Sequence, residues 1–168
     1  MSPFLKRKVN AHELGVEVCQ LFVGSDEGQT SFQNFLFWFK LHEIDHKRVY
    51  LELLYLRVFA AQFAVQMTLE GSPRMGAILD AFYAHLWRSA EQYPAGFVES
   101  SEMGRRLSMY TEAVKWPREV SVERAVARVF AELSETEMDF WVSKSCLEFS
   151  ATYLAVKQHL ESVRIVGD

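Results

Sequence analysis

The chain has 168 residues and a formal net charge of −4. Hydrophobic residues make up 49% and charged residues 24%, a composition that excludes an intrinsically disordered chain. No part of the sequence carries the basic surplus typical of nucleic-acid binding. Two cysteines, Cys19 and Cys146, are too few for a disulfide framework. We therefore expect a cytoplasmic protein in which both cysteines serve as small hydrophobic side chains.

The sequence predicts neither a transmembrane helix nor a secretory signal. The longest apolar stretch, residues 51–69, contains Arg57, and a central Arg costs ~2.5–3.5 kcal/mol on insertion scales. The Lys6-Arg7-Lys8 cluster is not followed by an apolar segment. Together with Phe4 and Leu5 it could attract an anionic membrane only weakly. We predict that residues 1–7 form a flexible, basic N-terminal tail.

Apolar residues recur at helical spacing between regularly placed glycines and prolines, and no segment alternates as a strand does. This pattern predicts an all-α fold, a single-domain bundle of six to seven helices over residues 1–168. The expected helices cover about 8–23, 41–69, 73–93, 100–116, 121–133 and 134–163, with a short one over about 30–39. The Arg105-Arg106 pair is expected on the solvated face of its helix.

Two local sequences predict where helices begin. Ser121 is placed to cap the helix that carries Val122 and Val126. Ser134-Glu-Thr-Glu137 matches a capping box, in which the Ser side chain and the Glu side chain each bind the other residue's backbone amide. Prolines at 73 and 117 mark a helix start and a helix stop.

The helix over about 41–69 is expected to lie at the centre of the bundle. Past Leu51 it is apolar on nearly all sides. A helix of that kind is either surrounded by other helices or buried in an oligomer interface. Because six helices do not easily cover it in a monomer, the sequence favours a homodimer.

One short motif carries chemistry. His42-Glu43-Ile44-Asp45-His46 has the H-E-x-x-H pattern, which on a helix places both imidazoles on one face. These five residues resemble the zincin metallopeptidase signature. The resemblance implies that His42 and His46 hold Zn²⁺ and that Glu43 acts on a metal-bound water. Glu99 is the best-placed carboxylate for a third ligand.

The surroundings of this motif favour a chance match. The flanking residues are charged, and no downstream third His follows. His42 and His46 also continue into the apolar stripe that begins at Val49, as ordinary amphipathic side chains would. Glu43 and Lys47 form an expected surface ion pair worth a few tenths of a kcal/mol. The E-x-x-H half of a di-iron site is present, but a second copy is not.

The sequence therefore predicts a non-catalytic helical protein that acts through protein–protein contacts, as a homodimer and without a cofactor. One alternative is a zinc-binding bundle, with hydrolytic activity, that uses His42, Glu43 and His46. A further alternative is a binder of an apolar small ligand in a Phe-rich core, since 13 of the residues are Phe.

Overall fold

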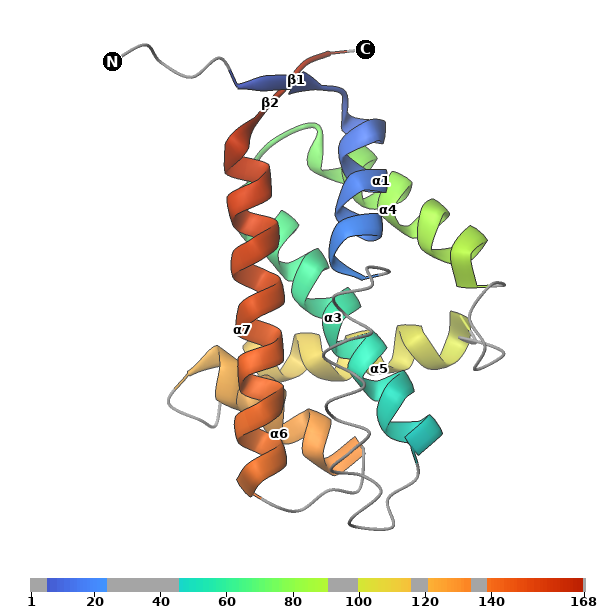
Figure 1. Cartoon of the computed structure of the whole chain (residues 1–168), viewed down its shortest axis with the longest axis vertical. Coiled ribbons are helices and arrows are strands. Elements are labelled where there is room, and N and C mark those ends of the chain that lie inside the picture. Colours follow the sequence, from blue (N-terminus) through green and yellow to red (C-terminus); the bar gives the residue numbers. More distant parts are fainter. Residues whose placement is uncertain (1–5, 24–45, 91–99, 116–120, 134–138, 168) are drawn as a thin grey trace.

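The computed structural model describes residues 6–23, 46–90, 100–115, 121–133 and 139–167. Within these ranges it confirms the all-α fold (Figure 1). The elements are β1 (Arg7–Val9), α1 (Ala11–Phe22), α3 (His46–Thr68), α4 (Met75–Ala90), α5 (Ser100–Lys115), α6 (Val122–Leu133), α7 (Asp139–Ser162) and β2 (Val163–Ile165). The predicted short helix at 30–39 and the capping box at 134–137 lie outside the described residues.

The long helix α3 runs through the middle of the molecule and contacts α1, α4, α5, α6 and α7 (Figure 1). Its buried residues lie on nearly all sides of the helix, and they are Val49, Glu52, Leu53, Leu54, Tyr55, Leu56, Val58, Phe59, Ala60, Ala61, Ala64 and Val65. A single chain therefore covers the helix whose apolar sides had suggested a dimer. None of the described helices combines the length and the apolar character needed to cross a membrane.

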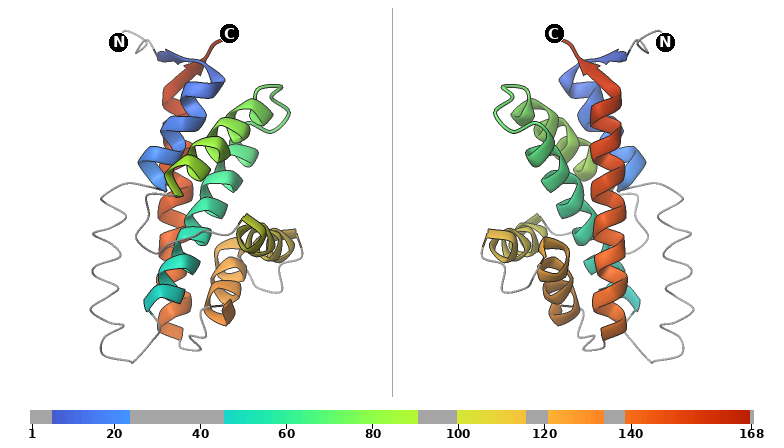
Figure 2. Two further views of the ribbon diagram at one scale, coloured as in Figure 1. Left: turned by 90° about the vertical axis from the view of Figure 1, so that its right-hand side faces the viewer. Right: turned by 90° about the vertical axis from the view of Figure 1, so that its left-hand side faces the viewer.

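Different helices pack together at the two ends of the molecule. At one end α4 packs mainly against α1, and at the other α6 packs against α7 and α5 (Figure 2). The long helix α7 spans both ends and packs along α3. Aromatic rings fill the seam between α3, α5 and α7, where Phe59 stacks on Tyr110 and on Phe149 at centroid distances of 5.3 and 6.1 Å.

Helix α1 begins with a capping box that the sequence analysis did not identify. The backbone N–H of Glu13 donates to the Asn10 side chain at 2.8 Å, and the Asn10 N–H donates to the Glu13 carboxylate at 3.2 Å. One turn later Gly15 allows α1 to approach α4 closely. A Cβ added at Gly15 would lie 2.3 Å from the backbone oxygen of Ile78, so only glycine fits there.

The strand β1 begins at Arg7, the last residue of the predicted basic tail, whereas residues 1–5 of that tail lie outside the described residues. β1 pairs in parallel with β2, and Arg7 aligns with Val163. The backbone N–H of Val166 extends the pairing by donating to the Val9 oxygen at 2.9 Å. Three residues are too few for a sequence pattern to reveal, and Arg7 is held further by Glu17 of α1.

Of two other predicted helix starts, the structure confirms one and moves the other. Ser121 caps α6 as expected, because its hydroxyl accepts from the Arg124 N–H at 3.3 Å. The turn before α4 is longer than predicted, and the helix begins at Met75 rather than at Pro73. Gly71 lies in that turn with φ of 75°, a conformation that favours glycine.

Candidate functional site

The residues of the H-E-x-x-H motif lie at the edge of the described structure. His42, Glu43 and Glu99 are outside the described residues. His46 is the first residue of α3, but its side chain is also outside them. Within the described ranges, no three His, Cys, Asp or Glu side chains come together as metal ligands. The zinc site therefore stays a prediction.

A buried charged cluster between α3 and α5 corrects one expectation. Arg106, expected on a solvated face, is only 8% exposed, whereas its neighbour Arg105 is exposed. The Arg106 guanidinium lies 2.8 Å from a carboxylate oxygen of Glu52, which is 2% exposed, and 2.9 Å from Glu102. The sequence offered no signal that separates the two adjacent arginines except their different angles on the helix.

Three polar atoms of this cluster are buried without a hydrogen-bond partner. The second carboxylate oxygen of Glu52, Nε of Arg106 and the hydroxyl of Tyr110 have no hydrogen-bond partner among the described residues. Burial raises the pKa of Glu52 to about 7, against the opposing effect of Arg106. Burial likewise raises the pKa of Tyr110 well above its usual value. A carboxyl group with such a pKa suits acid–base chemistry, but at 2% exposure a substrate has no access to it.

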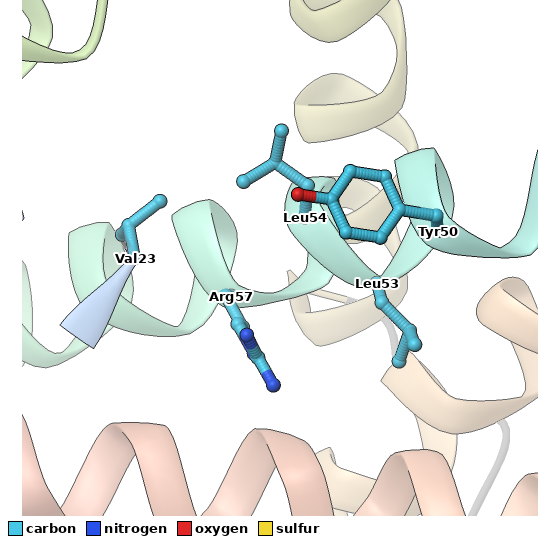
Figure 3. Close-up of a pocket in the computed structure, with 5 residues that line it drawn as sticks. All are labelled: Val23, Tyr50, Leu53, Leu54 and Arg57. Atoms are coloured by element: carbon cyan, nitrogen blue, oxygen red, sulfur yellow. The ribbon is translucent and has the colours of Figure 1, made fainter. Parts of the chain in front are cut away.

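A second ion pair crosses from α3 to α7 beside a small pocket. Nε of Arg57 donates to the Glu148 carboxylate at 2.5 Å, and both side chains are mostly buried. The pocket is lined by Val23, Tyr50, Leu53, Leu54 and Arg57 (Figure 3). Its volume of about 20 Å³ accommodates one water molecule, whereas ligand pockets usually have ~300–1,000 Å³. This pocket does not support the apolar-ligand alternative.

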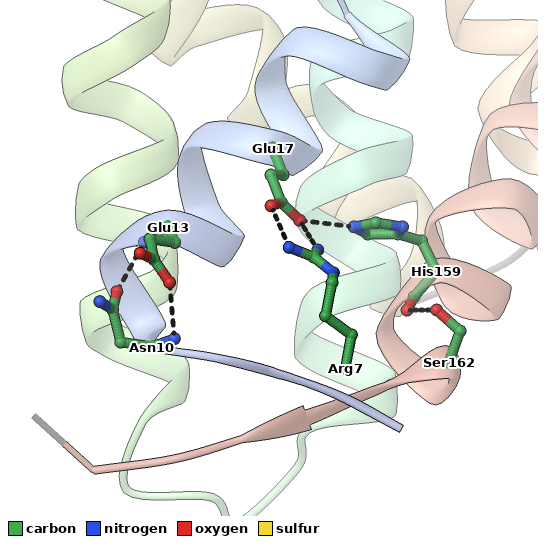
Figure 4. A network of polar contacts seen from close by, with 6 residues as sticks. All are labelled: Arg7, Asn10, Glu13, Glu17, His159 and Ser162. Atoms are coloured by element: carbon green, nitrogen blue, oxygen red, sulfur yellow. Dashed lines mark hydrogen bonds and ion pairs between the residues drawn. The ribbon is translucent and has the colours of Figure 1, made fainter. Parts of the chain in front are cut away.

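A third polar network joins the strand pair to α1 and α7 (Figure 4). Arg7 donates to the Glu17 carboxylate, whose other contact is with Nε2 of His159 at 3.2 Å. The hydrogen bond from Arg7 holds the pKa of Glu17 below its usual value. His159 also packs edge-on against Phe22 at 5.7 Å. The three side chains come from β1, α1 and α7, and their contacts fasten these elements together.

The outer face of α7 differs from these polar networks because it contains no charged side chain. We define it as the five exposed residues Ser143, Leu147, Ala151, Leu154 and Gln158, none of which is charged. Leu147 is 64% exposed and Leu154 is 51% exposed. Leu147 and Leu154 lie two turns apart on the same side of α7, whereas the other exposed large hydrophobic residues among those described, Leu21 and Met67, lie on α1 and α3.

The inner face of α7 is anchored, so the outer face has a defined orientation. Trp141, Phe149 and Val156 are almost fully buried against the core. In Figure 2, right, α7 lies in front of the other described helices along its whole length. With these three side chains buried, Leu147 and Leu154 lie on the side of α7 that faces away from the core.

No protein-family model, no curated protein and no solved structure matches this chain. The candidate site therefore depends on the chain's own geometry. The sequence analysis did not consider the outer face of α7. The signal that could have identified it is the seven-residue spacing of Leu147 and Leu154, with the uncharged Ala151 between them on the same side of the helix.

Proposed function

We propose that this chain is a non-catalytic helical protein that acts in the cytoplasm through protein–protein contacts, as a homodimer, with the outer face of α7 as its contact surface. The exposure of Leu147 and Leu154 on an uncharged helix face carries the proposal. Exposed apolar patches of this kind mark interaction surfaces, and the centres of interfaces are depleted of charge. The free thiols of Cys19 and Cys146 support a reducing compartment.

The other polar groups of the described structure support a non-catalytic role. The Glu52–Arg106 and Arg57–Glu148 pairs are buried between helices, where each ion neutralises the other. Arg7, Glu17 and His159 connect three elements. Each of these networks has a structural explanation, whereas no described part of the chain covers the two exposed leucines.

The proposal is tested by placing a charge on the outer face of α7. We expect Leu154→Glu to weaken self-association by at least about tenfold, because the interface must then bury a carboxylate without a partner. Sedimentation velocity over a range of protein concentrations measures the dissociation constant. Ser108→Glu is the matched control, since Ser108 is exposed on α5 and the added charge is the same.

Circular dichroism and the melting temperature confirm that both variants are folded. Equal dissociation constants for Leu154→Glu and the wild type would reject the outer face of α7 as the contact surface. Association lost equally in Ser108→Glu would show that added negative charge, and not its position, is responsible.

Native mass spectrometry of tag-free protein prepared without chelators tests the zinc alternative. We expect a dimer without a zinc mass. One zinc per chain in the wild type, absent from His42→Ala, would contradict the non-catalytic proposal and favour the zinc-binding alternative with His42, Glu43 and His46.

A further inference from the structure

Helix α5 is attached to the rest of the fold by few buried side chains. Of residues 101–115, only Met103, Arg106 and Tyr110 are buried, and two of the three bring a polar group inside. Helix α6 is shorter, yet it buries six residues, all of them apolar: Ala125, Val126, Ala127, Phe130, Ala131 and Leu133. Because few buried apolar contacts hold α5, it is the kind of element that opens locally while the rest of a fold stays packed.

The contact between α5 and α3 depends on one arginine that faces two carboxylates. Arg106 lies 2.8 Å from Glu52 of α3 and 2.9 Å from Glu102 of its own helix. The Glu102 side chain is 33% exposed and keeps contact with water, whereas Glu52 is 2% exposed. When both carboxylates are ionised, the single charge of Arg106 does not neutralise them. A proton on Glu52 removes this excess negative charge from the buried side of the cluster.

The other ionisable groups that act on Glu52, among the described residues, belong to the same two helices. Arg105 is exposed and lies 3.0 Å from Glu102, while Nε of Arg48 on α3 donates to a backbone oxygen of α6 at 3.0 Å. The hydroxyl of Tyr110 is buried without a hydrogen-bond partner in the described ranges, and so is the second carboxylate oxygen of Glu52. An ionised Glu52 is therefore poorly solvated while α5 is packed against α3.

We propose that α5 is a pH-sensitive element, which opens from α3 as the pH rises toward neutrality because opening gives the Glu52 carboxylate access to water. Burial raises the pKa of Glu52 from its usual value of 4.5 to about 7. Between these two values the packed state keeps a proton that the opened state releases to solvent. The equilibrium constant for opening therefore rises with pH over this range and levels off above it.

Opening also changes the surface of α3. Phe59 is 1% exposed, and it stacks on Tyr110 of α5 at 5.3 Å and on Phe149 of α7 at 6.1 Å. When α5 moves away, the Tyr110 ring leaves Phe59, whereas Phe149 stays in place. The change in pH is thereby coupled to the exposure of an aromatic side of α3.

Hydrogen exchange of the backbone amides of the full chain, measured by mass spectrometry between about pH 5 and about pH 8, tests this proposal. Dividing each exchange rate by the intrinsic rate at the same pH gives the opening constant. At every pH we expect the α5 amides to open at least about tenfold more often than the α7 amides, which are protected by the buried core. Over this range we expect the opening constant of α5 to rise at least about tenfold.

Two matched variants assign the pH dependence to Glu52. Glu52→Gln keeps the shape of the side chain but cannot ionise, so we expect its α5 opening constant to change by less than about threefold over the same range. Glu112→Gln makes the same chemical change at an exposed position of α5 and is expected to retain the wild-type rise. Carbon-13 NMR of the wild-type chain follows the Glu52 carboxyl directly, and we expect a titration midpoint of about 7.

The proposal is overturned if α5 and α7 have equal opening constants, because α5 then opens only with the whole fold. A wild-type α5 opening constant that does not change with pH, or an equal rise in Glu52→Gln, would show that Glu52 does not control the opening. A titration midpoint of Glu52 at its usual value of 4.5 would show that its carboxyl is already hydrated in the packed state.

Discussion

The outward surfaces of α5 and α7 differ in the charge of their exposed side chains. Of the exposed residues of α5, Arg105, Glu112 and Lys115 are charged, and they form ion pairs with neighbours on the same helix. The five residues of the outer face of α7 carry no charge and include two leucines, and the Lys157–Glu161 ion pair lies beside them. The outer side of α5 is therefore suited to water, and the outer side of α7 is suited to contact with another protein surface.

The inward surfaces of the same two helices are also different. α5 inserts Arg106 between Glu102 and the buried Glu52 of α3. α7 buries mostly apolar side chains, including Trp141 and Phe149. Thus α5 keeps a charge inside through pairing, whereas α7 leaves two leucines exposed among the described residues.

The largest expected effect comes from breaking the inner side of α5. Arg106→Ala leaves Glu52 buried without its cation, which is expected to lower the free energy of unfolding by about 3–5 kcal/mol at pH 8. Urea denaturation measures this change. The exposed neighbour provides the control, because Arg105→Ala is expected to leave the urea midpoint nearly unchanged. Equal midpoints for the two variants would show that Arg106 is not a buried partner of Glu52.

The pH dependence of stability provides a second test of the contact between Glu52 and Arg106. The pKa of Glu52 is raised to about 7, so its stabilising contribution is complete below the unfolded value near 4.5 and is lost as the pH rises through 7. Between pH 5 and pH 8 we expect the wild type to lose about 2 kcal/mol relative to Glu52→Gln, which lacks the titrating group. Urea denaturation of both proteins across this range measures the difference. Parallel pH profiles would contradict the raised pKa.

Salt provides a test that separates the outer face of α7 from the charged surface of α5. Because no charged residue lies within the outer face, raising NaCl from about 0.05 to about 0.5 M is expected to change the dissociation constant of the dimer by less than about threefold. Sedimentation velocity at both concentrations gives this value. A dimer that weakens tenfold or more in salt would be held by charges, and its interface would lie elsewhere.

The smallest expected effect is on the outer side of α5. Lys115→Ala removes one member of the exposed Lys115–Glu112 pair and is expected to change the free energy of unfolding by less than about 0.5 kcal/mol. It should leave the dissociation constant of the dimer unchanged. A loss of self-association in this variant would place α5, and not α7, at the contact surface.

Helix positions and inward faces could be predicted from the sequence because they depend on local spacing. Trp141, Phe149 and Val156 recur at helical spacing along the last helix, and all three are buried. The start at Ser121 could be predicted because capping involves only neighbouring residues. Periodicity also indicated that α3 would be apolar on most sides, but it could not show that one chain suffices to cover it.

The candidate site depended on information that local spacing does not contain. Arg105 and Arg106 are chemically identical, and only the position of Glu52 on another helix decides which of them is buried. Similarly, an exposed Leu154 is recognised only after the inner side of α7 has been packed. The motif that did attract attention, His42 to His46, matches a signature by residue type, whereas a metal site requires ligands brought together by the fold.

The pairing of β1 with β2 has a consequence for the order of events during synthesis. α1 and its capping box are synthesised early. The strand that contains Val9 can form only after Ile165, more than 150 residues later, has been synthesised. Closing so long a loop costs conformational entropy that local helix formation does not. We expect the helices to assemble first and the two strands to join last, so that the short sheet reports completion of the native fold.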